Sequence, residues 1–199
     1  MASAVFRVFA SRNGNAPSQS MANLWYNRFF DTRIKKHKKQ MDLHLEEIAR
    51  FMRMGTDRPE GELARRVETL LEDAPIIPKG VWMRHGDRFL LCGTIGSQFD
   101  VWHRRISLTS AADALVAQAI GAAAVERVMD GLENEIKESL PAGEEIKHRR
   151  SPGYPGYPMS LNAEILSLLG ATKTIGVSAT DSMMLLPSKS VVAICEVAK

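Results

Sequence analysis

The chain has 199 residues, of which 45% are apolar and 25% charged, so it can form one ordinary domain with a hydrophobic core. The composition excludes a chain that is disordered throughout. No stretch reaches the roughly 18 uninterrupted apolar residues that cross a bilayer, since even Ala111 to Val125 carries Asp113 and Gln118. Two cysteines in apolar runs, without CxxC spacing, predict buried free thiols in a reducing compartment. We expect a soluble, cytoplasmic protein with no membrane partner.

The net charge of +3 is divided unevenly along the chain. Residues 1–40 contain eight Lys or Arg and one acid, whereas residues 41–199 contain eighteen Lys or Arg and twenty-two acids. We therefore predict a basic, flexible extension over 1–40 and a single, mildly acidic domain over 41–199 that does not bind nucleic acid. A targeting sequence or an upstream coding artefact explains residues 1–40 equally well, and an adaptor that binds nucleic acid or membrane through them is a further hypothesis.

Apolar residues at helical spacing predict five helices in the proposed domain. The predicted helices cover residues 43–52, a second segment that follows Asp57 and runs to residue 74, and residues 98–105, 110–140 and 162–169. Asp57 is expected to cap the second helix, and Gly170 follows the last helix where a C-terminal glycine is common. Small residues at Gly121 to Ala124 predict that other backbone packs closely against the long fourth helix.

Two regions of the sequence have the pattern of strands. Apolar runs on either side of His85-Gly86-Asp87-Arg88 predict a hairpin within residues 76–95. Residues 174–197 predict two more strands, separated by Pro187-Ser188-Lys189-Ser190. The expected fold class is therefore α+β, with an antiparallel twisted sheet built from these two regions and helices grouped around its ends.

The segment with the most chemical information is Arg149-x-x-x-Gly153-Tyr154-x-x-x-Pro158. Prolines and glycines from Pro152 onwards predict a stiff loop that can present backbone N–H and C=O groups to a ligand. The Arg149 guanidinium suits a carboxylate, and Tyr154 offers an aromatic face with a hydroxyl. From the residues alone, a proline-rich turn with solvated arginines is the simpler interpretation.

The same four residues form the S-adenosylmethionine-binding motif of the activation domain of cobalamin-dependent methionine synthase. The chain resembles this family from about Leu43 to the C-terminus, most specifically over 121–137 and 149–195. Three short segments look closest to the stand-alone homologues of anaerobic bacteria. These are Thr94-Ile95-Gly96, Phe99-Asp100 and Pro187-Ser188-Lys189-Ser190.

The resemblance implies a role for each matching residue. Arg149 would hold the methionyl carboxylate, and the backbone of Ser151 to Gly153 would recognise adenine. Tyr154 would lie near the corrin ring as the catalytic residue, and Glu126 matches a helical Glu at the ligand's amino-acid end. A solvated helix acid is an equally good explanation of Glu126.

One departure from the family lies in the last strand. The family has an aromatic pair beside the ligand there, whereas this chain has Ile194 and Cys195. Cys195 is therefore expected at the ligand site without the aromatic contact, which weakens the prediction of tight binding. The five histidines show no metal-ligand spacing.

The function implied by the resemblance is reductive methylation of cob(II)alamin with S-adenosylmethionine as methyl donor. The cobalamin would be carried by a separate methionine synthase or corrinoid protein, and flavodoxin or ferredoxin would supply the electron. Because 199 residues leave no room for a cobalamin-binding or substrate domain, the chain would act in trans. The alternative is a non-catalytic assembly protein that docks a corrinoid protein through the 149–158 segment, so enzymatic activity stays open.

Overall fold

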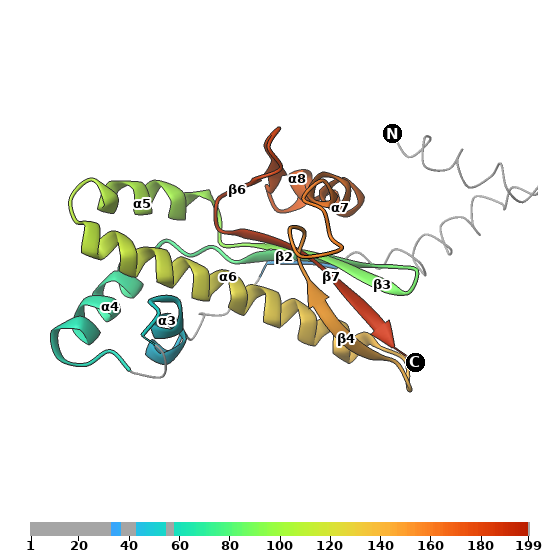
Figure 1. The fold of residues 1–199 in the computed structure, drawn as a ribbon, viewed down its shortest axis with the longest axis horizontal. Helices are drawn as coiled ribbons and strands as arrows, with labels where there is room; N and C mark the ends of the chain where they lie inside the picture. The colour runs from blue at the N-terminus through green and yellow to red at the C-terminus, as the bar shows by residue number, and fades with distance from the viewer. Residues whose placement is uncertain (1–32, 37–42, 55–57, 199) are drawn as a thin grey trace, which may run out of the picture. The chain divides into compact units, whose positions relative to one another are not determined.

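The computed structural model describes residues 33–36, 43–54 and 58–198 (Figure 1). Their centre is a five-stranded sheet, in which every neighbouring pair of strands is antiparallel. The sheet order is β1 (Arg33–Lys36), β2 (Lys79–His85), β3 (Arg88–Thr94), β7 (Ser190–Ala198) and β4 (Glu145–Arg150). The predicted α+β class with an antiparallel sheet is confirmed.

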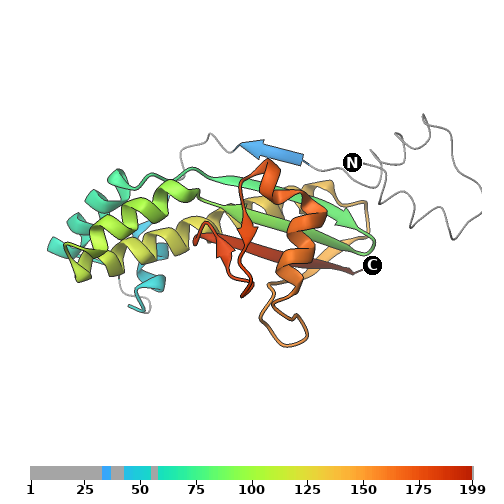
Figure 2. The same ribbon diagram turned by 90° about the horizontal axis from the view of Figure 1, so that it is seen from above.

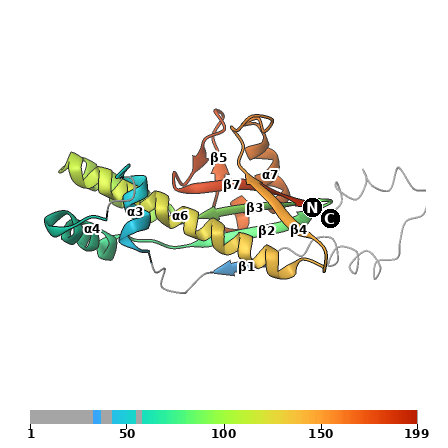
Figure 3. The same cartoon turned by 60° about the horizontal axis from the view of Figure 1, so that its bottom comes forward.

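Two helices cover the two faces of this sheet. The long helix α6 (Ala111–Ser139) crosses one face, and α7 (Leu161–Leu169) lies on the other, as Figure 1 and Figure 3 show. Three further helices pack mainly against α6, beside the sheet. They are α3 (Leu45–Phe51), α4 (Gly61–Asp73) and α5 (Ser97–Ser107). Residues buried on both faces explain why β2 and β3 read as continuous apolar runs.

Helix α6 packs closely on the sheet because two glycines face it. Gly80 of β2 and Gly93 of β3 are direct cross-strand partners. A Cβ atom on Gly80 would lie 2.6 Å from Leu132 Cδ2, and one on Gly93 would lie 2.8 Å from Met129 Sδ. Both distances are too short for real Cβ contacts, so a larger residue at either position would require the buried Leu132 or Met129 side chain to shift.

Several local predictions from the sequence are confirmed. The β2–β3 hairpin turns at Gly86, whose φ of +66° suits the first position of a two-residue turn. Gly170 ends α7 with a left-handed φ of +60°, as predicted. The structure adds a cap that was not predicted, because Ser110 Oγ accepts the Asp113 N–H at the start of α6. The predicted cap Asp57 lies outside the described residues. The sequence predicted that other backbone would pack closely at Gly121. In the structure the Phe99 side chain of α5 packs there instead.

The prediction of two sheet strands within residues 174–197 is partly wrong. Only β7 joins the main sheet. The earlier part forms the single-turn helix α8 (Ala171–Thr174) and the short strands β5 (Ser178–Ala179) and β6 (Leu185–Leu186), which pair with each other (Figure 2). Strand β4 pairs with β7 at the edge of the sheet instead. The sequence pattern did not reveal β4 because its side chains are mostly polar and exposed.

The basic N-terminal segment contributes one described element. Strand β1 pairs with β2 along four residues, so residues 33–36 belong to the sheet rather than to an extension. The rest of residues 1–40 lies outside the described ranges, where the predicted extension stays a prediction. No helix in the described part of the chain is long and apolar enough to cross a membrane.

Candidate functional site

Arg149 lies on β4 and meets a row of carboxylates on α6. Its Nη2 contacts Glu126 Oε2 at 2.8 Å, and its Nη1 contacts Asp130 Oδ1 at 2.9 Å and Glu133 Oε2 at 3.3 Å. The three acids are spaced four and three residues apart, which places them on one face of the helix. The structure therefore brings together Arg149 and Glu126, the two residues predicted to bind the ligand's amino-acid end. It adds two acids that the sequence reading missed.

The four groups carry an excess of two negative charges. The side chain of Arg149 is 20% exposed, whereas that of Asp130 is 60% exposed, so the cluster opens to solvent on the acidic side. A guanidinium has five N–H donors, and the contacts with the acids involve only Nη1 and Nη2. The arrangement can accept an ammonium group at the carboxylates and a carboxylate at Arg149.

The 151–158 loop is closed by its own backbone. The Gly153 N–H donates to the Tyr157 carbonyl at 2.6 Å, and the Tyr157 N–H donates to the Tyr154 carbonyl at 2.9 Å. Gly153 has a φ of +101°, and a Cβ there would lie 2.9 Å from Met159 Sδ, so glycine is required. Because the Gly153 N–H is already bonded, a nucleotide base recognised here must use other backbone groups of the loop.

The remaining predicted residues of the motif are at the surface. Tyr154 is 61% exposed, and Pro158 is also exposed. Ser151 and Pro152 are half-buried at the end of β4. The loop therefore exposes Tyr154 to solvent and keeps its base near Arg149.

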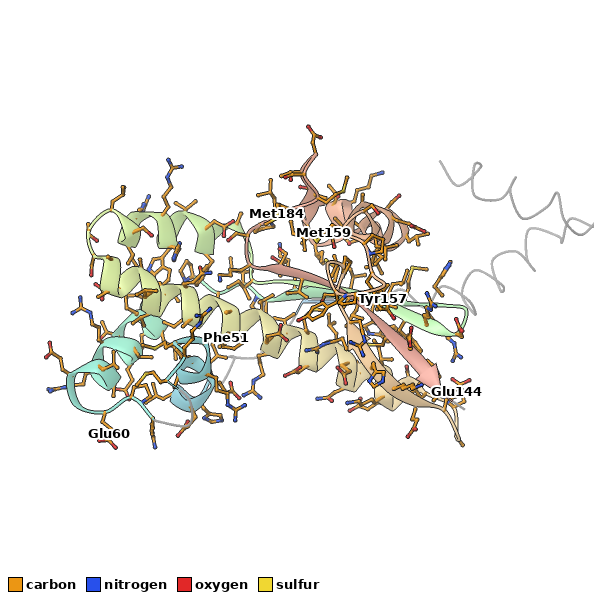
Figure 4. All side chains as sticks on the ribbon, in the orientation of Figure 1. Phe51, Glu60, Glu144, Tyr157, Met159 and Met184 are labelled. Atoms are coloured by element: carbon orange, nitrogen blue, oxygen red, sulfur yellow. The ribbon has the colours of Figure 1, made fainter. Side chains whose placement is uncertain are left out.

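A second tyrosine, Tyr157, ties the loop to the sheet. Its hydroxyl donates to Glu196 Oε1 of β7 at 2.6 Å, and Figure 4 shows this side chain over the sheet. The hydrogen bond lowers the pKa of Glu196 and raises the pKa of Tyr157, because it stabilises the carboxylate and the neutral phenol. The sequence reading missed this pair, although a second tyrosine in the motif loop was a visible signal.

Cys195 does not lie at an accessible ligand site. It faces α6 from β7, opposite Arg149 in the strand register, and is fully buried in the core. Burial raises the pKa of the Cys195 thiol and of the Cys92 thiol to about 12, so neither ionises near neutral pH. Packed side chains cover the Cys195 sulfur in this structure, and the expected contact of Cys195 with a ligand stays a prediction. Both cysteines are free and buried, as predicted.

The three segments that resemble the stand-alone homologues meet at one junction. Ser188 donates its N–H and its hydroxyl to the Asp100 carboxylate at 2.9 and 2.5 Å. Ser190 Oγ donates to Thr94 Oγ1 at 2.9 Å, and Lys189 is only 8% exposed. Desolvation by burial lowers the pKa of Lys189. This junction fixes the start of β7 against the end of β3, and its polar groups bond to one another.

The described residues around Arg149 form no metal centre. Within residues 33–36, 43–54 and 58–198, no three His, Cys, Asp or Glu side chains are grouped to hold a metal ion. A hollow of about 270 Å³ is lined by Glu196, Lys147 and Arg88, among others, but not by Arg149 or the 151–158 loop. A ligand at Arg149 would therefore lie along the open edge of the sheet.

Comparison with known proteins supports the fold. A solved structure described as the MetH reactivation domain bound to AdoHcy matches with a TM-score of 0.56. The match has 13% identity and covers 83% of this chain and 78% of that chain. At this identity the likeness shows the fold alone. No family model matches the chain, and no curated protein matches its sequence.

Proposed function

We propose that the chain binds S-adenosylmethionine at Arg149, Glu126 and the 151–158 loop. In this proposal it supports reductive methylation of cob(II)alamin on a separate methionine synthase or related corrinoid protein. The observation that carries the proposal is the contact between Arg149 and Glu126 at 2.8 Å, next to the motif loop. The fold likeness to a solved structure described as the MetH reactivation domain bound to AdoHcy adds support.

The charges at this contact suit an amino-acid end group. Free Nε–H and Nη–H donors of Arg149 would hold the ligand carboxylate, while Glu126 and Asp130 would attract its ammonium. The extra negative charge also favours a cationic sulfonium ligand over its neutral thioether product. When the ligand binds, Arg149 gives up part of its contact with the acids and contacts the ligand carboxylate instead. This loss limits the net gain in affinity for the ligand.

The chain's own residues would contribute orientation rather than acid–base chemistry. When bound, S-adenosylmethionine supplies an electrophilic methyl group, and the partner's cobalamin supplies the metal that accepts it. In this proposal Tyr154, which is exposed in the loop, would face the partner's corrin ring. Holding the methyl donor against the partner reduces the entropic cost of their encounter. Flavodoxin or ferredoxin is the proposed electron donor.

Calorimetry with purified protein tests the binding step. S-adenosylmethionine should bind, and Arg149→Ala should weaken binding by about 10–100-fold, since hydrogen bonds to charged groups contribute this much. Arg150→Ala is the matched control, because it removes one positive charge from the exposed neighbouring residue. Absence of binding by the unmodified chain, with and without a cobalamin protein, would contradict the proposal.

The alternative function is a non-catalytic assembly protein that uses the 149–158 segment to dock a corrinoid protein. The closure of the Gly153 N–H within the loop and the burial of Cys195 favour it, since both remove expected ligand contacts. The Arg149→Ala variant separates the two functions. Under the first, partner binding survives and methylation fails; under the second, complex formation itself is lost.

A further inference from the structure

Tyr157 is the residue through which the 151–158 loop is both closed and attached. Its carbonyl accepts the Gly153 N–H at 2.6 Å, and its own N–H donates to the Tyr154 carbonyl at 2.9 Å. Its hydroxyl reaches out of the loop to Glu196 at 2.6 Å. A phenol that donates to a carboxylate at this distance makes a strong, charge-assisted hydrogen bond. Movement of the Tyr157 side chain would therefore also move the backbone groups that close the loop.

Glu196 is held in place independently of the loop. It lies on β7 between Arg88 of β3 and His148 of β4, its cross-strand partners in the register. Arg88, Lys147 and His148 surround the carboxylate with positive charge, which keeps it ionised. Loss of the tyrosine hydroxyl would thus leave Glu196 compensated by these neighbours, so the fold should survive the substitution.

We propose that Tyr157 and Glu196 are positioning residues, which hold the 151–158 loop in the conformation that receives the nucleotide end of the ligand. The positioning role rests on the proposed function, whereas the attachment of the loop to β7 does not. Because the pair fixes the loop before the ligand binds, the loop loses less conformational entropy on binding. Neither residue needs to touch the ligand or the reacting atoms.

Amide hydrogen exchange tests the attachment without any ligand. In Tyr157→Phe, the Gly153 and Tyr157 amides should exchange about 3–10-fold faster than in the unmodified protein, as expected for loss of one hydrogen bond. Glu196→Gln should also make the Gly153 and Tyr157 amides exchange faster. In the double variant the two effects should not add, because the two side chains act through each other. Glu164→Gln, which removes an exposed carboxylate from α7, is the matched control and should leave these amides unchanged.

Calorimetry on the same variants tests the positioning role. Tyr157→Phe and Glu196→Gln should weaken S-adenosylmethionine binding several-fold, while the midpoint of thermal unfolding stays close to that of the unmodified chain. Unchanged exchange at Gly153 and Tyr157, or fully additive effects in the double variant, would overturn the attachment. If exchange is faster but the unmodified chain binds no S-adenosylmethionine, the attachment stands, and the positioning role fails together with the proposed function.

Discussion

Two regions of the domain are stabilised by different forces. At the sheet–helix interface, formed by Gly80, Gly93, Met129 and Leu132, there is no room for one additional carbon atom. At the β4 edge, formed by Arg149 and the 151–158 loop, contacts are charged or polar and largely open to solvent. Dense packing makes the stability of the first region sensitive to changes in side-chain volume, whereas solvent screening limits how much each charged contact of the second region contributes to stability. The region that specifies the fold is thus separate from the region that offers ligand chemistry.

The largest effect on stability is expected at the sheet–helix interface. Leu132 is 1% exposed, so Leu132→Ala should lower the free energy of unfolding by about 2–5 kcal/mol through loss of burial and creation of a cavity. Urea denaturation gives this value. Gly80→Ala, which should destabilise the unmodified protein, should be neutral or stabilising in the Leu132→Ala background because the added methyl enters the cavity. Equal costs in both backgrounds would show that the two residues do not share this space.

A smaller effect is expected for Arg149. Arg149→Ala removes the cation that Glu126 and Asp130 share, while Glu133 keeps its ion pair with Lys137 at 2.8 Å, so the change should cost about 1–2 kcal/mol of folding free energy after solvent screening. Adding Glu133→Gln should recover part of the loss by removing one of the three repelling charges. The recovery should shrink at high salt. If Arg149→Ala is as stable as the unmodified chain, the acids are not held by this guanidinium.

The smallest effect concerns the Tyr157–Glu196 hydrogen bond and its dependence on pH. The bond lowers the pKa of Glu196, so its contribution is lost in acid as the carboxylate protonates through that lowered pKa. It raises the pKa of Tyr157, so its contribution is lost in alkali as the phenol ionises through that raised pKa. Between the unfolded-state values, about 4.3 and about 10, the contribution is complete.

A pH titration followed by nuclear magnetic resonance should detect the ionisation of Glu196 next to the loop. The charged groups facing the pair are Arg88, Lys147, His148 and Arg150. The Glu196 side-chain carboxyl should titrate below its ordinary range, and Tyr157→Phe should move its midpoint back upwards. The global unfolding midpoint should change little over the same acid range on account of this pair, since both groups are near the surface. A Glu196 midpoint that Tyr157→Phe leaves unchanged would contradict the hydrogen bond.

The sequence predicted those elements whose signal is local. Helical spacing identified α6, and the Gly86-Asp87 turn between apolar runs identified the β2–β3 hairpin. Strand β4 was missed because an exposed edge strand with alternating charged residues has no apolar pattern. The region before β7 was assigned to the sheet because its apolar residues resemble a strand, yet it forms α8 and the separate β5–β6 pair. An apolar pattern in the sequence cannot by itself distinguish a strand of the main sheet from a segment that is buried outside it.

The same division applies to the candidate site. The sequence by itself determined the motif from Arg149 to Pro158 and the stiffness of its loop, because both depend on residues close together in the chain. Only the tertiary structure decided which acids surround Arg149, that Cys195 is buried, and that Tyr157 bonds to Glu196. These contacts depend on the pairing of β4 with β7 and on the rotation of α6 about its axis. Both arise from packing between segments distant in sequence, which no local pattern encodes.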